Sequence, residues 1–329
     1  MSKAYDIIGF GECLIDLVAI RSSDGNKVNM EGTAGGATLN VCAAAAKLGR
    51  KTAYITKIGP DLCGRFIRDQ IEQNNVEYRG YTAKTELTTL AVVTLDETGD
   101  REFAFYQNGT ASATLSVDDI DFDFLREGRI FNFGTVNMTN EITFEANVKA
   151  AKRAKADGVI VAFDPNYRTH LWPSEREAVR AMRAGFEIAD YIKASEEEAE
   201  IFTGSADPSE AAKLIMEQFR PKFLAVTLGS LGAIALSPFG QAQVPAYRVS
   251  TVDTTAAGDA FWGAALHKLL EYEDGGRVLD SLALEELLAY ANAAGSHATT
   301  IMGAMPSLAD EADILKLCNE RHCERREAI

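Results

Sequence analysis

The segment 252–261 places small residues and one carboxylate at the start of an apolar stretch. If a helix begins here, the small residues Ala256, Ala257 and Gly258 leave its first backbone N–H groups unhindered. These groups and the positive end of the helix dipole form a site for an anion. Asp259 lies in the first turn, where a carboxylate often serves only helix electrostatics. Beside a bound phosphate it could instead accept the proton of an alcohol, as general base catalysis of phosphoryl transfer requires.

Two other phosphate-binding patterns in the chain are incomplete. Gly9-Phe10-Gly11 follows an apolar run, but Leu14 stands where a dinucleotide fingerprint requires a third glycine. Residues 59–66 contain the two glycines of a P-loop but lack its lysine and its serine or threonine. The segment 252–261 is therefore the strongest phosphate-binding candidate.

Composition limits the classes of partner that the protein can have. The chain has 329 residues, 47% apolar and 25% charged, which allows one large domain or two at most. Its 33 basic and 48 acidic side chains give a net charge of −15, which disfavours binding to nucleic acid. No apolar run is long enough for a membrane span, and the N-terminus lacks the apolar core of a signal peptide. Five scattered cysteines without a CxxC pair indicate reduced thiols in a cytoplasmic protein. Four histidines without metal-ligand spacing disfavour a histidine-based metal centre.

The elements that must position the segment 252–261 follow an α/β pattern. Strands are predicted at 4–11, 51–58, 130–133, 159–164, 191–194, 223–227 and 233–236, and helices at 37–48, 65–74, 141–156, 175–189, 196–203, 208–218, 256–270 and 284–297. Buried strands that alternate with helices predict a layered α/β fold with a mostly parallel sheet, whose ligands bind beyond the carboxyl ends of the strands. Alternating Thr, Val, Tyr and Phe at 78–106 and a similar stretch at 18–29, around turns at 96–100 and 22–25, predict antiparallel hairpins of a separate small sheet.

Six motifs in order resemble the ribokinase/PfkB family of sugar kinases. Residues 253–259 resemble its DTTGAGD signature, and the other matches are 35–41 (GG-xxx-NV), 59–64, 164–168 with 172–173 (DPN-x-R…WP), 193–198 (K-x-S-xx-E) and 226–229 (VTLG). The resemblance implies a ribokinase-like α/β/α fold, with a mostly parallel central sheet in a single kinase domain over 1–329. It also implies a small β-lid formed by segments at about 17–32 and 78–110. Ala256 stands where most members have glycine, and we expect the change to be tolerated. Only a positive φ there would strain the alanine, by roughly 1–2 kcal/mol.

The resemblance implies roles in catalysis and sugar binding. Asp259 would be the general base, Arg168 would neutralise charge during transfer, and the N–H groups of Ala256, Ala257 and Gly258 would form the anion hole. The sugar site would consist of Asp16, Gly35, Gly36, Asn40, Phe105, Tyr106, Arg168 and Asp259, while Phe103 could equally pack into the core. The glycines would let the backbone approach the sugar ring. Arg168 could instead form a surface salt bridge.

The resemblance also implies sites for ATP and two cations. The nucleotide site would consist of Lys193, Ser195, Glu198, Thr227, Gly229, Gly232, Ala257, Gly258 and Asn292, with Glu198 organising Mg²⁺ through water. A potassium site would consist of Asp253, Thr255, Ala298, Ile301, Gly303 and Ser307. The alternative interpretations are tight turns at Gly229 and Gly232, packing of Asn292 in its helix, and an exposed helix start at residues 196–198.

The predicted activity is ATP-dependent phosphorylation of a sugar hydroxyl. D-fructose is the favoured substrate, because the Trp172-Pro173 segment and the three consecutive glutamates resemble fructokinases. 2-Keto-3-deoxygluconate is disfavoured, because the neutral Gln107 stands where an acid sugar calls for arginine. A ribokinase remains an alternative, as does a non-catalytic sugar-binding regulator. ATP and the sugar are the expected partners, without nucleic acid or membrane, and the lid is expected to pair two copies into a homodimer.

Overall fold

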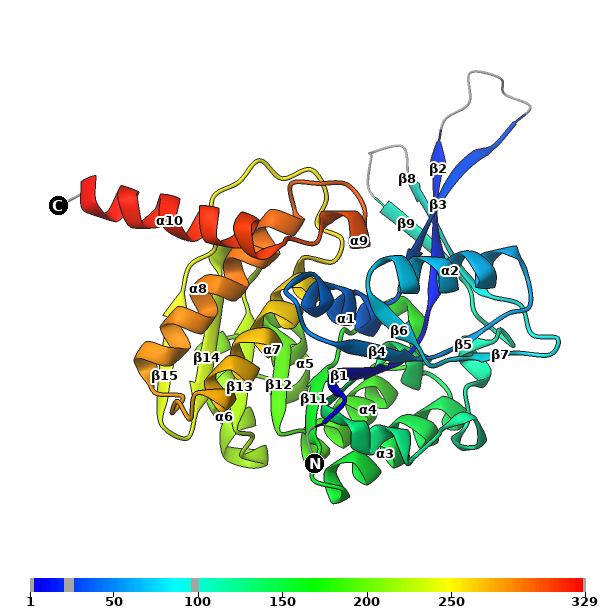
Figure 1. Ribbon diagram of the computed structural model, residues 1–329, viewed down its shortest axis with the longest axis horizontal. Coiled ribbons are helices and arrows are strands. Elements are labelled where there is room, and N and C mark those ends of the chain that lie inside the picture. Colours follow the sequence, from blue (N-terminus) through cyan, green and yellow to red (C-terminus); the bar gives the residue numbers. More distant parts are fainter. Residues whose placement is uncertain (1–2, 21–26, 96–100, 328–329) are drawn as a thin grey trace.

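A central sheet organises the computed structural model of the chain, which describes residues 3–20, 27–95 and 101–327 (Figure 1). Within these residues the sheet has nine strands. Their order is β15 (Gly240–Val244), β14 (Ala233–Ser237), β13 (Phe223–Thr227), β12 (Tyr191–Ser195), β11 (Ile160–Asp164), β10 (Gly128–Gly134), β1 (Tyr5–Phe10), β4 (Thr52–Ile55) and β6 (Val76–Tyr78). The strands from β13 to β6 run parallel, and β14 and β15 continue the sheet antiparallel. The predicted mostly parallel sheet is thus confirmed.

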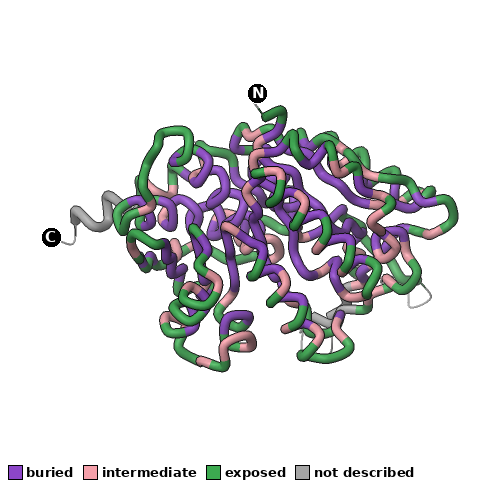
Figure 2. Tube along the Cα trace, turned by 90° about the horizontal axis from the view of Figure 1, so that it is seen from below, coloured by how far each residue is buried: buried purple, intermediate pink, exposed green. Residues whose placement is uncertain are grey.

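Helices cover both faces of this sheet, because alternate residues of its buried strands point to opposite sides. Ile7 packs into one apolar cluster and Ile8 into the other. The first cluster contains residues of α1 (Ala37–Lys47), α2 (Leu62–Gln73), α7 (Ala257–Asp274), α8 (Ser281–Ala298), α9 (Ala304–Ser307) and α10 (Glu311–Glu327). The second contains residues of α3 (Glu141–Ala156), α4 (Glu175–Ile188), α5 (Glu196–Thr203) and α6 (Pro208–Phe219). Figure 2 shows buried residues in the middle with exposed residues around them, and the two clusters on opposite faces of the sheet confirm the layered fold.

A smaller sheet projects from the main body beside α2 (Figure 1). It consists of β3 (Asn29–Gly35), β2 (Leu14–Ile20), β8 (Thr89–Leu95) and β9 (Arg101–Tyr106), in that order. The outer pairs are antiparallel, as the hairpin patterns predict, but β2 and β8 pair in parallel at the centre. The predicted turns at 22–25 and 96–100, and the side chain of Phe103, lie outside the described part of the chain.

The predicted strand at 51–58 divides into two. β4 joins the main sheet, whereas β5 (Lys57–Ile58) pairs in parallel with β7 (Tyr81–Thr82) in a separate ribbon. The segment 78–110 therefore enters the lid only from β8 onward. Residues 112–138 add short 3-10 turns at Ser112–Thr114, Val117–Asp119, Phe124–Glu127 and Val136–Met138, and two more lie at Thr169–Leu171 and Gly229–Leu231.

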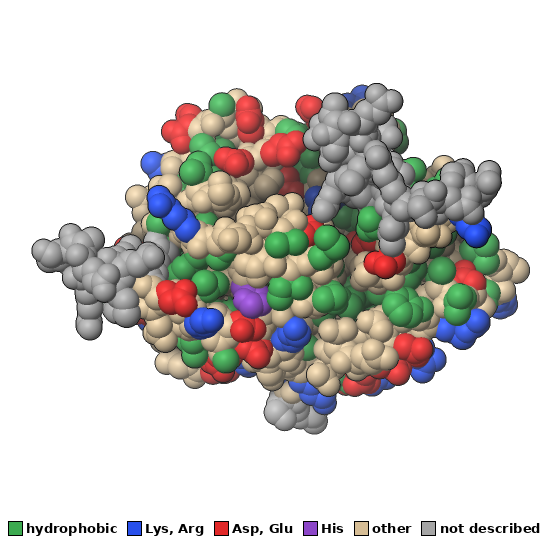
Figure 3. Space-filling model, turned by 90° about the horizontal axis from the view of Figure 1, so that it is seen from above, with side chains coloured by type: hydrophobic (Ala, Val, Ile, Leu, Met, Phe, Trp, Pro, Cys, Tyr) green, Lys and Arg blue, Asp and Glu red, His purple; other side chains and the backbone are tan. Residues whose placement is uncertain are grey.

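The surface seen from above carries acidic and basic side chains interspersed around a middle region where hydrophobic side chains are visible (Figure 3). The excess of acidic residues is therefore not gathered into one patch on the described part of that face. Of the helices described, none is long and apolar enough to cross a membrane.

Candidate active site

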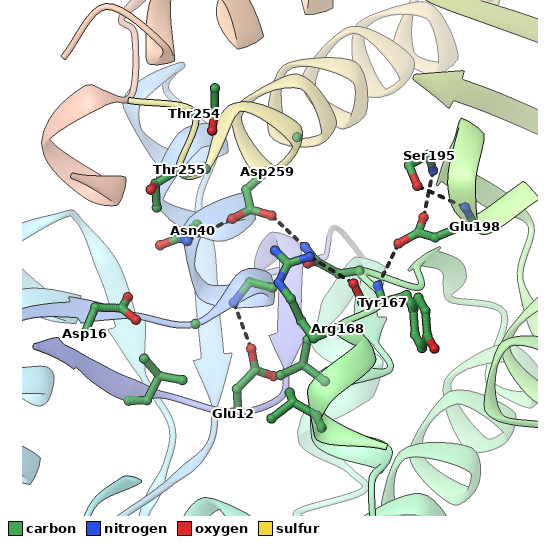
Figure 4. A pocket seen from close by; sticks show the side chains of 18 of the residues that line it. Glu12, Asp16, Asn40, Tyr167, Arg168, Ser195, Glu198, Thr254, Thr255 and Asp259 are labelled. Carbon is green, nitrogen blue, oxygen red and sulfur yellow. Dashed lines mark hydrogen bonds between the residues drawn. The ribbon is translucent and has the colours of Figure 1, made fainter. Parts of the chain in front are cut away.

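A cavity of about 500 Å³ lies beyond the carboxyl ends of the parallel strands. Its walls come from segments that follow β1, β10 and β11, from the carboxyl ends of β12 and β13, from the N-termini of α1, α5 and α7, and from lid strands β2 and β9 (Figure 4). The sheet order explains the position, because connections from β1 and β10 leave the sheet in opposite directions and open a crevice between them. Of the predicted site residues, the cavity is lined by Asp16, Gly36, Asn40, Phe105, Arg168, Lys193, Ser195, Glu198, Thr227, Thr255, Ala256, Gly258 and Asp259.

Asp259 is held at the centre of this cavity by two side-chain amides. Asn40 Nδ2 donates to Oδ2 at 2.8 Å, and Asn166 Nδ2 donates to Oδ1 at 2.9 Å. Asp259 is only 6% exposed, and burial raises the pKa of its carboxyl against the opposing effects of the amides and nearby cations. The two amide hydrogen bonds, one to each oxygen, fix the plane of the Asp259 carboxylate. A carboxylate with a raised pKa in a cavity is suited to accept a proton.

The start of α7 has the geometry of an anion site. Ala256 is the N-cap, with φ 61° and ψ 8°, so the condition under which alanine is strained is met. The left-handed residue turns the chain so that Thr254, Thr255, Ala256 and Gly258 all line the cavity. The first N–H groups of a helix have no partner within it, and α7 aligns 18 residues behind them.

A buried ion pair lies beside this helix start. Lys193 Nζ donates to both carboxylate oxygens of Asp164 at 3.0 Å, and both residues are 4% exposed. Burial alone would lower the pKa of Lys193, but the carboxylates of Asp164, Glu198 and Asp259 outweigh it and raise that pKa. A Cβ on Gly258 would lie 3.2 Å from Lys193 Nζ, so the glycine allows the ammonium to approach the anion loop.

Glu198 is the buried member of the three consecutive glutamates, whereas Glu196 and Glu197 are exposed. Its side chain closes a capping box at the start of α5, with Oε2 accepting from Ser195 N at 2.7 Å. Oε1 accepts from Tyr167 N at 2.6 Å. Glu198 therefore ties the loop after β11 to the helix after β12, and its carboxylate borders the cavity.

A buried carboxylate, Glu12, and a half-buried one, Asp16, line the end of the cavity away from Glu198. Glu12 Oε1 accepts from Ala37 N, the first residue of α1, at 2.8 Å, and burial raises the pKa of Glu12 to about 7. Burial also raises the pKa of Asp16 to about 6. The two glycines at 35–36 make room for these groups. A Cβ on Gly35 would lie 2.4 Å from Asp16 Oδ2, and one on Gly36 would lie 2.5 Å from the Glu12 carbonyl oxygen.

The lid contacts the main body at the rim of this end. The ring of Phe105 in β9 stacks on His170, with centroids 4.8 Å apart and planes at 29°. Both residues line the cavity, close to Arg168, whose Nη1 donates to Tyr167 O. Tyr106, the next residue of β9, is 63% exposed and lies outside the cavity lining, as alternation along a strand requires.

The remaining predicted nucleotide residues lie outside the cavity lining. They are Ala257, Gly229, Gly232 and Asn292. Asn292 Nδ2 donates to Val244 O and Pro245 O at 2.9 and 3.3 Å, so its amide holds the loop after β15. Gly229 and Gly232 adopt φ 54° and 104°, and a Cβ at Gly232 would lie 2.1 Å from Val244 O. Both glycines thus form a tight turn.

The predicted potassium residues come from two segments that the structure brings together. Asp253 Oδ1 accepts from the Thr255 amide and hydroxyl at 2.9 and 2.7 Å, and its Oδ2 accepts from Gly303 N at 3.0 Å. Ser307 donates from Oγ to Ala304 O. Within the described ranges no three His, Cys, Asp or Glu side chains group as metal ligands. A cation site here would combine the Asp253 carboxylate with hydroxyl and backbone carbonyl oxygens, which suit a hard cation.

Sequence reasoning missed several residues of the cavity. Glu12, Leu14, Val136, Asn166, His170 and Thr254 line it without an assigned role, and Asp164 supports it from behind. Asp164 and Asn166 belong to a segment that the motifs single out, and Glu12 follows the carboxyl end of the first strand. These positions in the sequence therefore mark all three residues as candidates for the site.

The sequence and the fold were compared with those of known proteins. Residues 5–311 match the model of the pfkB family carbohydrate kinases. The chain is 37% identical over 325 residues to a protein of Arabidopsis thaliana named probable fructokinase-5, covering 98% of this chain and 99% of the relative. The crystal structure of a fructokinase with bound ATP from Xylella fastidiosa superposes with a TM-score of 0.86 at 30% identity, covering 96% and 99%.

A second solved structure is a fructokinase double mutant from Vibrio cholerae with fructose, ADP and potassium ion bound. Its TM-score is 0.82 at 27% identity, and the match covers 97% of this chain and 100% of that one. The family match spans most of the chain and both solved structures share its fold, so the chain belongs to the pfkB family of carbohydrate kinases, as a fructokinase-like member.

Proposed function

We propose that the protein transfers the γ-phosphoryl group of ATP to a hydroxyl of D-fructose, with Asp259 as the general base. The observation that carries the proposal is the position of Asp259, clamped by Asn40 and Asn166 beside the N-terminus of α7 in one cavity. The carboxylate takes the hydroxyl proton as the hydroxyl oxygen bonds to the γ-phosphorus. The bond from that phosphorus to the leaving oxygen breaks, and ADP departs with its electron pair.

The charges around the cavity support phosphoryl transfer. The helix N-terminus, Lys193 and Arg168 supply positive potential, which offsets the negative charge on the phosphate oxygens during transfer. Mg²⁺ bound with ATP would neutralise part of the phosphate charge. Glu198 would hold it through water, because magnesium binds by one or two carboxylates and keeps several waters. The buried Glu198 carboxylate at the cavity wall fits such a role.

The chemistry of the sugar end supports fructose over an acid sugar. Glu12 and Asp16 are acceptors that suit hydroxyl groups and repel a carboxylate. A smaller cavity beneath the lid adjoins the first through Glu12 and Phe105 and is lined by the neutral Gln107. The relatives named fructokinases agree with this choice. ADP release with a sugar panel tests it, and a higher kcat/KM for 2-keto-3-deoxygluconate than for fructose would overturn it.

The role of Asp259 is tested by Asp259→Asn, which keeps the shape but cannot accept the proton. We expect kcat to fall roughly 10²-fold or more, with modest changes in the KM values for fructose and ATP. Asp280 is the matched control, because it caps α8 by accepting from Ala283 N at 2.9 Å and is absent from the cavity lining. Asp280→Asn should cost at most about 1 kcal/mol of stability and leave kcat unchanged. A folded Asp259→Asn variant with near-normal kcat would refute the general-base role.

A further inference from the structure

Asn166 combines three features that an ordinary structural asparagine does not need. It follows β11 by two residues, adopts φ 48°, and is 6% exposed. Positive φ is uncommon outside glycine, and although asparagine tolerates it better than most residues, buried examples cluster at functional sites. Its Nδ2 donates to Asp259 Oδ1 across 93 positions of sequence.

Asn166 also has an unpartnered side-chain carbonyl oxygen. Oδ1 of Asn166 is buried, and within residues 3–20, 27–95 and 101–327 it has no hydrogen-bond partner. Turning the amide over would point this oxygen at the Asp259 carboxylate, so the observed orientation is set by donation to Asp259. An unsatisfied buried polar atom in a native structure calls for an explanation. Donation to the carboxylate supplies one.

The backbone of Asn166 is fixed as tightly as its side chain. Its N–H donates to Asp164 Oδ1 at 3.2 Å, and the same carboxylate binds Lys193. The next residue, Tyr167, donates its N–H to Glu198. The left-handed turn is thus held from both sides, and the amide that it carries donates to Asp259.

We propose that Asn166 is a positioning residue for the catalytic carboxylate: its amide fixes the plane of Asp259 and stabilises the charged form that accepts the substrate proton. The proposal rests on the proposed role of Asp259 as general base. Asn40 makes the matching contact with the other oxygen, but it lies in helix α1, and the resemblance already assigns it to the sugar.

Other charges also act on the carboxylate, and a pH profile must be interpreted with them in mind. The groups that interact with Asp259 come from the segment after β1, from β2, β11 and β12, and from the loop after β11. They are Glu12, Asp16, Asp164, Lys193 and Arg168, together with the buried Tyr54 of β4. Replacing Asn166 leaves all of them in place, so a change in the profile reports on the amide itself.

The decisive variant is Asn166→Gly, because glycine adopts the left-handed backbone without strain and removes only the amide. Losing the N–H donor raises the pKa of Asp259, so the acid limb of the kcat/KM profile for fructose should move to higher pH by roughly half to one unit. A shift of one pH unit corresponds to a tenfold lower kcat/KM at pH values below the acid limb. The KM for ATP should stay within about twofold of the wild-type value, since the amide bonds only the base.

Asn166→Asp is the second variant, with nearly the same shape and tolerance of positive φ. It replaces the donor by a carboxylate, so the acid limb should move further than in Asn166→Gly. The control is Asn75→Gly, an exposed asparagine after α2 with φ 58°. Asn75→Gly should change neither the acid limb of the kcat/KM profile nor kcat. Melting temperatures show that each variant is folded, and Asn166→Asp decides if Asn166→Gly does not fold.

An acid limb at the wild-type pH in the folded Asn166 variants would overturn the proposal, even if kcat fell, because a purely structural residue would give that result. The Asp259→Asn variant separates this failure from failure of the proposed function. If Asp259→Asn is inactive and the acid limb of the kcat/KM profile does not move in the Asn166 variants, only the positioning role is wrong. If Asp259→Asn retains normal kcat, both are wrong.

Discussion

Replacing Ala256 with glycine should stabilise the protein. Ala256 caps α7 with φ 61° and ψ 8°, a conformation that costs an L-residue roughly 1–2 kcal/mol. Glycine adopts it freely but is more flexible in the unfolded chain, which costs roughly 0.4–1 kcal/mol. The difference predicts a gain of about 0.5–1 kcal/mol in the free energy of unfolding.

Urea unfolding is the appropriate assay for Ala256→Gly. With an unfolding entropy of roughly 2.1 cal/mol/K per residue, a chain of 329 residues shifts its Tm by only about 1 °C for such a gain. The urea midpoint should rise with an unchanged m value. The anion loop keeps all its backbone N–H groups, so kcat should stay within about threefold of the wild-type value.

Ala257→Gly is the matched control, because Ala257 is the first residue with helical geometry in α7. There glycine gains nothing and should lower the free energy of unfolding by about 0.5–1 kcal/mol. If Ala256→Gly destabilises the protein as much as Ala257→Gly does, the strain argument is refuted.

Three further predictions concern pH, cations and assembly. Burial raises the pKa of Glu12 from 4.5 to about 7, so its contribution to stability is complete below pH 4.5 and is lost as the pH rises through 7. Between pH 5 and pH 8 the wild-type free energy of unfolding should therefore fall roughly 2–3 kcal/mol more than that of Glu12→Gln, and equal falls in urea unfolding would contradict this. The contacts of Asp253 with the loop at Gly303 support a cation site, so potassium should raise kcat/KM above its value in sodium or choline at equal ionic strength, and identical rates would remove the assignment. Lid residues Val18 and Met30 are each 45% exposed, which supports pairing of two lids, and sedimentation showing only monomers at micromolar concentration would exclude it.

The sequence by itself determined the features that depend on neighbouring residues. Strand and helix positions follow from hydrophobic periodicity, which is why helices such as α3 and α5 match their predicted bounds. The small residues before Asp259 predict an open helix N-terminus, because the properties of that terminus are local. The order of the motifs along the chain identifies the family without any knowledge of contacts in the fold.

Only the tertiary structure decided which distant groups meet. Asn40 and Asn166 reach Asp259 across 219 and 93 positions of sequence, and Lys193 reaches Asp164 across 29. These contacts depend on the order of strands in the sheet, which periodicity does not reveal. Burial, and with it the raised pKa of Glu12, also depends on what packs around a side chain.

The same distinction applies to the small residues at 256, before α7, and at 35–36, before α1. The sequence showed alanine in place of glycine at 256, but the sign of φ is set by the path of the chain between the last strands and α7. Likewise the sequence predicts that the glycines at 35 and 36 admit the sugar, and the structure adds that their missing side chains leave room for Asp16 and for the backbone of Glu12. Local sequence specifies which backbone conformations a residue can adopt. The packing of segments far apart in the chain selects one of these conformations and the residue's neighbours.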